Sequence, residues 1–258
     1  MSGIKNGIMN INKPKPWTRN ELILAINLYC KTPFGRIHVR NQDIIALADK
    51  LERTPGSVSY KLANFASLDD LLPREGASNV SKLDKAVWNE FFQDWDGMAY
   101  ESETRVSELL DQPIEQWKDI DMLPEGKSRE TMVRARVNQG FFRKMILASY
   151  DGACCITGMA VAELLVASHI VPWSVDSKNR MNPQNGLCLN ALHDRAFDKG
   201  LITIDDSFKV VVARHIADIP FKKAKLIRDY DSTLLTMPKR FIPDERFLQY
   251  HRQHIFQG

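Results

Sequence analysis

The stretch CCITGMAVAELLVASHIVPWSVDSKNRMNPQNGLCLNALHDRAFDKG, residues 154–200, decides the fold of this chain. It places His169 at the end of an apolar run, Asn185 sixteen residues later and His193 eight residues beyond that. Two acidic residues follow closely after the second histidine. Histidines and acids at this density in one short segment indicate a candidate site for acid–base or metal chemistry.

The pattern around these residues predicts a hairpin followed by a helix. Residues 164–167 suit a strand that enters the core, and residues 190–197 suit a helix. Asn185 and Gly186 favour the turn before this helix. An asparagine side chain can bond to backbone groups, so we expect Asn185 to hold the loop that carries His169.

These side chains suit phosphodiester hydrolysis, which requires a group that activates water and ligands that hold a divalent cation near the phosphate. His169 lies at the end of the predicted strand, and the helix would bring His193 and Asp194 toward the metal. The alternative for His169 is a structural histidine with satisfied hydrogen bonds. Arg143, on a preceding basic helix, and Arg180, in the loop, are the candidate phosphate contacts.

Several motif blocks in residues 130–215 resemble the HNH endonuclease superfamily. Within it they are similar to a restriction-like subfamily with the patterns A-x-H-I-x-P-W and N-G-L-x-L…H-D-x-A-F-D-x-G. The matching runs are VNQGFFRKMILASYDGACCITG, LLVASHIVPW and NPQNGLCLNALHDRAFDKGLITI. The resemblance implies a ββα-metal fold and Mg²⁺-type cleavage of DNA. It also implies that His169 is the general base and that Asn185 orients its loop.

The expected metal site departs from the family pattern at one position. Many members carry an acid or a histidine directly before the base, where this chain has Ser168. The usual family spacing selects Asp194 as the helix ligand rather than His193. We expect His193 and Asp194 to bind the metal, His193 to be catalytic as well, and Asp198 to support the metal. Mg²⁺ is the expected ion, because hard cations accept carboxylate oxygen, while imidazole suits Mn²⁺ or Ni²⁺ better.

The four cysteines, at positions 30, 154, 155 and 188, form no C-x-x-C pair. Adjacent Cys154 and Cys155 cannot easily form a zinc knuckle, whose thiolates are spaced to reach one tetrahedral ion. Reduced, partly buried thiols are therefore expected. A structural Zn²⁺ held by Cys154, Cys188 and a histidine is the less favoured alternative.

Residues 1–66 predict a helical module that begins with an arm of 16 residues. Thr18 and Glu21 form a capping box at the start of its first helix. A helix over residues 42–51, a three-residue turn and a helix capped by Thr54 then have the dimensions of a helix-turn-helix. A small helical bundle with a tight turn fits the same pattern equally well.

The helix-turn-helix interpretation predicts which groups of this module would contact DNA. Arg53 lies at the turn, and Lys61 lies on the second helix among residues expected to be exposed, namely Ser57, Ser59 and Tyr60. Arg53 and Lys61 are therefore the candidate nucleic-acid contacts of this module.

The expected fold class of the chain is α+β. We divide the chain into three parts. Residues 1–66 form the helical module, residues 67–127 an acidic helical connector, and residues 128–258 the HNH nuclease domain. In the last part a long helix is expected from about residue 128 to residue 150, with Gly140 as a candidate break. A β-hairpin is expected after Gly200.

The charge is unevenly distributed along the chain. Lys and Arg outnumber Asp and Glu by 10 to 4 in residues 1–66 and by 18 to 12 in residues 131–258, against 7 to 16 between them. A polyanionic partner such as DNA would account for two basic segments, although ordinary solvated surfaces produce the same distribution.

No apolar run approaches the roughly 20 residues of a membrane span, so we expect a cytoplasmic protein that does not bind membranes. The leading hypothesis is an endonuclease of a restriction or antiviral defence type that hydrolyses DNA phosphodiester bonds. It would act as a homodimer if it cuts both strands together. A DNA-binding regulator on a degenerate, non-cleaving HNH scaffold and an RNA-cleaving nuclease are the alternatives.

Overall fold

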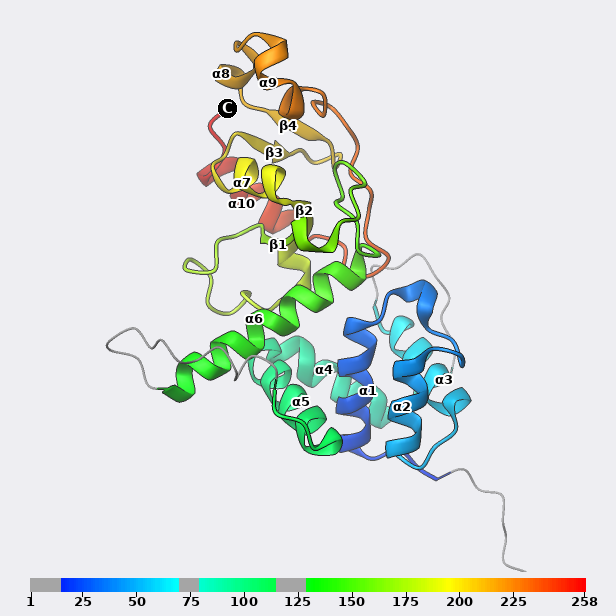
Figure 1. Cartoon of the computed structure of the whole chain (residues 1–258). Helices are drawn as coiled ribbons and strands as arrows, with labels where there is room; N and C mark the ends of the chain where they lie inside the picture. Colours follow the sequence, from blue (N-terminus) through cyan, green and yellow to red (C-terminus); the bar gives the residue numbers. More distant parts are fainter. Residues whose placement is uncertain (1–14, 70–78, 115–128) are drawn as a thin grey trace, which may run out of the picture.

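The computed structural model describes residues 15–69, 79–114 and 129–258. Its N-terminal part is a bundle of helices (Figure 1). These helices are α1 (Arg19–Lys31), the 3-10 turn η1 (Phe34–Arg36), α2 (Gln42–Lys50), α3 (Pro55–Ala66), α4 (Lys82–Gln93) and α5 (Trp95–Leu110). α1 packs against α2, α3, α4 and α5, so it forms the centre of the bundle. The acidic helices expected to connect two modules therefore share a core with the first three.

The start of α1 is the capping box that the sequence predicts. The side chain of Thr18 accepts a hydrogen bond from the N–H of Glu21, and the Glu21 carboxylate accepts one from the N–H of Thr18 at 2.8 Å. The side chains of Leu22, Ile26 and Tyr29 are fully buried. A helix of this length depends on its neighbours for stability, and the apolar surface of α1 explains its central position.

Two basic side chains expected to contact DNA are engaged inside the bundle. Lys61 is only 7% exposed, and its ammonium group lies 2.9 Å from each carboxylate oxygen of Asp84. The guanidinium of Arg53 bonds to Glu21 at 3.0 Å and lies 4.1 Å from the centre of the Trp17 ring. The predicted exposure of Lys61 is wrong, because Asp84 neutralises its charge within the core. The helix-turn-helix stays a prediction.

Helix α6 (Arg129–Ser149) joins the two parts of the molecule (Figure 1). It contacts α1 and α5 as well as the strands that follow it. The helix continues through Gly140, so the break considered there does not occur. Phe141, Phe142 and Met145 are buried and belong to an apolar cluster that includes residues of both parts.

The C-terminal part contains the hairpin and helix that the sequence predicts. Its first elements are the 3-10 turn η3 (Ala162–Leu164), strand β1 (Leu165–His169), the 3-10 turn η4 (Pro183–Asn185), strand β2 (Gly186–Asn190) and helix α7 (Ala191–Asp198). The strands are antiparallel: Leu165 pairs with Asn190, and His169 pairs with Gly186. Both strands contact α7 and α6. This arrangement gives the α+β fold class.

Gly186 was expected to lie in a turn directly before the helix, and that expectation is wrong. It is the first residue of β2, and the strand rather than a turn leads into α7. A Cβ atom at this position would lie 2.5 Å from Cδ1 of Ile146 and 2.9 Å from Cζ of Phe142. Glycine therefore lets β2 approach α6 closely.

The chain then forms a second hairpin, as predicted after Gly200. Its strands β3 (Ile202–Ile204) and β4 (Val210–Val212) are antiparallel, and they precede the helices α8 (Arg214–Ala217), α9 (Phe221–Arg228) and α10 (Glu245–His254). None of the helices in the described ranges is long and apolar enough to cross a membrane.

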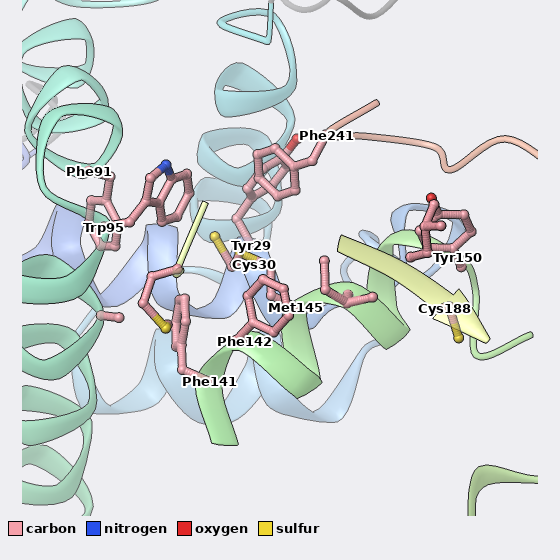
Figure 2. Packing of buried hydrophobic residues seen from close by; sticks show 14 of the residues in the cluster. Tyr29, Cys30, Phe91, Trp95, Phe141, Phe142, Met145, Tyr150, Cys188 and Phe241 are labelled. Atoms are coloured by element: carbon pink, nitrogen blue, oxygen red, sulfur yellow. The ribbon is translucent and has the colours of Figure 1, made fainter. Parts of the chain in front are cut away.

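The segment between α9 and α10 returns to the helical bundle. The ring of Phe241 lies 6.3 Å from that of Tyr29 and 5.8 Å from that of Trp95, and Figure 2 shows these side chains together. The guanidinium of Arg240 is fully buried and donates hydrogen bonds to the carbonyl oxygens of Tyr29 and Thr32 at the end of α1. This segment therefore anchors the C-terminal part to the bundle.

Candidate active site

His169 ends β1, and aromatic side chains surround its ring. The ring stacks on Phe142 of α6 at a centroid distance of 4.2 Å, and Trp173 meets it edge-on at 5.4 Å. Its Nε2 atom lies 2.8 Å from the carbonyl oxygen of Arg180. Because a carbonyl can only accept, Nε2 carries the proton and Nδ1 carries the lone pair of the neutral ring.

The protonation of His169 follows from these surroundings. Burial lowers its pKa, while the Arg180 carbonyl and the charge of Asp194 oppose the shift and leave it smaller. The imidazole is therefore neutral at pH 7, with Nδ1 unprotonated. A neutral imidazole in a fixed tautomer is the form that accepts a proton from water.

Asn185 closes the loop that follows β1. Its side chain is fully buried, and Oδ1 accepts a hydrogen bond from the N–H of Val171 at 2.8 Å. Its Nδ2 donates to the carbonyl oxygens of Val171 and Asn179, each at 3.2 Å. Asn179 directly precedes Arg180, whose carbonyl holds His169. Asn185 therefore fixes both ends of the loop that orients the histidine.

Asp194 of α7 lies close enough to His169 for its charge to act on the imidazole. Asp194 and Asp198 are one helical turn apart, so their side chains share a face of the helix. Burial raises the pKa of both, and repulsion from Asp194 raises that of Asp198 further. The buried hydroxyl of Ser168 faces Asp194 closely enough to favour its ionised form, but without the geometry of a full hydrogen bond.

His193 lies on another face of α7. Its Nδ1 atom is 3.0 Å from Oδ1 of Asn190, and its ring meets Tyr230 edge-on at 5.0 Å. Burial alone lowers the pKa of His193, with no contribution from either aspartate. Adjacent residues of a helix do not share a face, so α7 directs His193 and Asp194 into different surroundings.

The two candidate phosphate contacts, Arg143 and Arg180, differ in how many hydrogen bonds their guanidinium groups make within the protein. Arg143 donates to the carbonyl oxygens of Leu165 at 2.6 Å and Ala162 at 3.1 Å, so its guanidinium braces the entry to β1. Arg180 donates from Nε to the carbonyl of Ser177 at 3.0 Å, and its guanidinium lies over the Trp173 ring at 5.1 Å.

A groove of about 270 Å³ borders His169 between α6 and β1. Phe142 and Trp173 contribute its aromatic walls, and Gln139 and Arg143 contribute polar groups. The groove offers space for part of a substrate next to the histidine. Its polar lining comes from α6, the helix that also contacts the bundle.

The donors of this site fit a hard cation. In the described ranges, no three or more His, Cys, Asp or Glu side chains gather as a metal site. The carboxylate of Asp194 remains near His169, with the hydroxyl of Ser168 facing it and the carboxylate of Asp198 one helical turn away. Mg²⁺ commonly binds one or two carboxylates and completes its shell with water and substrate phosphate. These residues therefore suit Mg²⁺ better than an ion that requires a full protein shell.

The cysteines lie apart from these carboxylates in the buried core. All four are free and buried, and the side-chain amide of Asn190 approaches Sγ of Cys154 at 3.7 Å. Burial raises the pKa of Cys155 and Cys188, which keeps both thiols protonated.

The sequence did not reveal the aromatic stack on His169. Phe142 lies within the long helix predicted before the motif, and the backbone carbonyl of Arg180 has no signature in a side-chain pattern. The single signal was the apolar pair Phe141 and Phe142 placed on that helix before the motif.

Comparison with known proteins agrees with this geometry. Residues 154–205 match the HNH endonuclease family, and this range contains β1, β2, α7 and the side chains of His169, Asn185 and Asp194. The match covers a minor part of the 258 residues and supports a nuclease function for this segment. HNH nucleases generally use a divalent metal.

One solved structure, described as a modification-dependent TagI restriction endonuclease, is similar with 19% identity and a TM-score of 0.33. The alignment covers 44% of this chain and 37% of that chain, well under two thirds of its length. A search of curated proteins found no match.

Proposed function

We propose that the chain is a metal-dependent endonuclease that hydrolyses DNA phosphodiester bonds with His169 as the general base. The observation that supports this most strongly is the neutral imidazole of His169, held in one tautomer by the Arg180 carbonyl beside a groove. The carboxylate of Asp194 lies near the ring, and that of Asp198 lies near Asp194. The segment that contains all of these residues matches a nuclease family.

In this proposal Nδ1 of His169 accepts a proton from the attacking water. Asn185 keeps the ring in place through the loop, because it bonds to the carbonyl of Asn179 next to Arg180. The guanidinium of Arg180 contacts phosphate at the rim, where it already lies over Trp173. Arg143 supports β1 instead, since its guanidinium is bonded to backbone carbonyls.

Asp194 and Asp198 would hold the divalent cation, with Ser168 beside them. When bound, this cation neutralises charge on the scissile phosphate and on the leaving oxygen. Burial raises the pKa of both carboxyl groups, and repulsion from Asp194 raises that of Asp198 further, so a cation would relieve an unfavourable pair of charges. We assign the metal to these two acids rather than to His193, which has Asn190 and Tyr230 as neighbours.

A DNA-binding protein that does not cleave is the second candidate. Ser168 replaces an expected ligand, and the described residues offer no cluster of three ligating side chains. In that case the fold around His169 would persist while the hydrolytic step would be lost. Such a protein would bind DNA without cutting it at any metal concentration.

Incubation of the protein with matched DNA and RNA in Mg²⁺, Mn²⁺ or Ni²⁺ tests the proposal. We expect metal-dependent cleavage of DNA, removed by EDTA and strongly reduced in Asp194→Asn. Cleavage of RNA alone would replace the proposed substrate, and DNA binding without any cleavage would establish the second candidate. Modified and unmodified DNAs in the same assay test the restriction role, and light scattering tests the homodimer.

A further inference from the structure

The C-terminal end of α7 is capped by residues that follow α10 and by His251 within it. The last carbonyls of a helix have no partner within the helix and require one elsewhere. The carbonyl oxygen of Phe197 accepts from the N–H of Gly200 at 2.8 Å and lies 3.0 Å from Nε2 of His251, and the side-chain amide of Gln257 donates to the carbonyl of Lys199 at 2.8 Å. The backbone N–H of Gln257 donates to the carbonyl oxygen of Gly200 at 2.9 Å. Figure 1 shows α10 beside α7.

His251 is held so that it presents one donor to α7. Its side chain is 1% exposed, and its ring stacks on Phe197 at a centroid distance of 3.7 Å. Nδ1 lies 2.8 Å from the hydroxyl of Thr203 in β3. Since Nε2 must donate to a carbonyl, Nδ1 accepts the hydroxyl proton of Thr203. The imidazole therefore links α10, β3 and α7 in a defined orientation.

The contact between the residue after α7 and the residues after α10 leaves no room for a side chain at Gly200. Gly200 has a φ of +65°, and a Cβ atom there would lie 2.0 Å from the carbonyl oxygen of Ile255. The backbone of Gly200 therefore packs directly against the backbone of Ile255 and Phe256. The two segments can therefore shift relative to one another only if these hydrogen bonds break.

α7 is a helix of eight residues, which is too short to be stable without neighbours. Asn190 caps its first turn from one end. At the other end the carbonyl of Phe197 precedes Asp198 directly. The position of the Asp194 and Asp198 carboxylates thus depends on groups at both ends of the helix.

We propose that residues 251–257 form a C-terminal clamp in which His251 and Gln257 act as positioning residues for the carboxylates of α7. This inference rests on the proposed function of Asp194 and Asp198. The clamp contacts neither substrate nor metal. It acts by holding the last turn of α7 against β3 and α10.

Hydrogen exchange of the metal-free protein tests the clamp without reference to activity. In His251→Phe the ring can still stack on Phe197, but both hydrogen bonds are lost. We expect amides of α7 to exchange about tenfold faster, with α1 unchanged, because one helix-end bond is removed. His251→Gln, which keeps a donor, should restore most of the protection. His254→Phe, at an exposed position of α10, is the matched control and should leave exchange unchanged.

A chain that ends at residue 256 provides the second test, because it lacks both bonds from Gln257. We expect faster exchange in α7 and a lower kcat for DNA cleavage, with KM close to that of the full chain, since the DNA-contacting surface is intact. Unchanged exchange in α7 for both His251→Phe and the shortened chain would overturn the clamp. If the full chain does not cleave nucleic acid, the proposed function fails, while the exchange data still decide whether α7 is clamped.

Discussion

A histidine acts as a base only if the nitrogen that faces water has no proton at the working pH. For His169 the Arg180 carbonyl determines which nitrogen this is, and burial between Phe142 and Trp173 keeps the ring neutral. The imidazolium that forms after proton transfer is less favoured by the same burial. The negative charge of Asp194 offsets part of this cost.

Removal of the Asn185 side chain should disturb both stability and cleavage. Asn185→Ala leaves the buried N–H and carbonyl of Val171 without partners, so we expect a loss of about 2 kcal/mol in the free energy of unfolding. Asn185→Asp keeps the acceptor but loses both donors, and should also release the loop. Urea denaturation and cleavage rates measure the two effects, with exposed Asn20→Ala as the control. A fully active Asn185→Ala would contradict the assigned role.

Two neighbouring residues of α7 should respond differently to substitution. Asp194→Asn is expected to lower single-turnover cleavage about 100-fold and to weaken Mn²⁺ binding, because it removes a carboxylate from the proposed cation site. His193→Gln should change Mn²⁺ affinity little, since His193 contacts Asn190 and Tyr230. Calorimetric titration with Mn²⁺ separates the two. Equal loss of Mn²⁺ affinity in both variants would restore His193 as a ligand.

The spacing of residues predicted some parts of this site better than others. The positions of His169 and Asn185 could be predicted because the end of an apolar strand and an asparagine in a loop are both recognisable from the neighbouring residues. The choice between His193 and Asp194 depends on the rotation of α7, which follows from its packing on both strands and is not fixed by spacing. Lys61 was misplaced for a similar reason, since its partner Asp84 belongs to another helix.

At the scale of elements, the capping box of α1 also supports the neighbouring turn. Burial alone would raise the pKa of Glu21, but hydrogen bonds from Arg53 and from Thr18 outweigh it and lower the pKa to about 2. One carboxylate therefore caps α1 and neutralises the arginine between α2 and α3. Loss of the charge should weaken both contacts together.

Because the folded-state pKa of Glu21 is depressed, its stabilisation is complete above the unfolded value of 4.5 and is lost as the pH falls toward 2. We expect Glu21→Gln to lower the free energy of unfolding by up to about 3 kcal/mol at pH 7 and by much less near pH 3. Urea denaturation at both pH values measures this difference. An equal loss at both would show that the charge contributes nothing.

The helices with strong caps were predicted closely, while β2 was not. α1 and α3 begin where Thr18 and Thr54 cap them, because caps are local and leave a clear sequence signature. Asn185 and Gly186, which were expected to form a turn before the helix, lie instead at the end of η4 and at the start of β2, because Gly186 must approach α6. That approach is a tertiary contact and has no local signature.

At the scale of the molecule, the C-terminal segment connects the bundle to the candidate site. Arg240 binds the end of α1, and residues 251–257 bind the end of α7. A single buried cluster, which includes Phe241 and Phe142, extends across both parts. The sequence does not reveal these contacts, because they join residues more than 200 positions apart.

Replacement of Arg240 tests this connection. Arg240→Met keeps much of the buried volume but leaves the carbonyls of Tyr29 and Thr32 without their donor, so we expect a loss of about 2–4 kcal/mol. Lys239→Met is the matched neighbour, because its ion pair with Asp151 is about half exposed and should be worth less than about 1 kcal/mol. Urea denaturation compares them. A smaller loss for Arg240→Met than for Lys239→Met would contradict the anchor.

The central claim is that His169 activates water for phosphodiester hydrolysis. The most direct test is single-turnover DNA cleavage by His169→Gly, with and without added imidazole, beside His38→Gly as an exposed-histidine control. We predict a fall of about 10²–10⁴-fold for His169→Gly, partly reversed by imidazole, and a wild-type rate for the control. Cleavage by His169→Gly at the wild-type rate without imidazole would contradict the account.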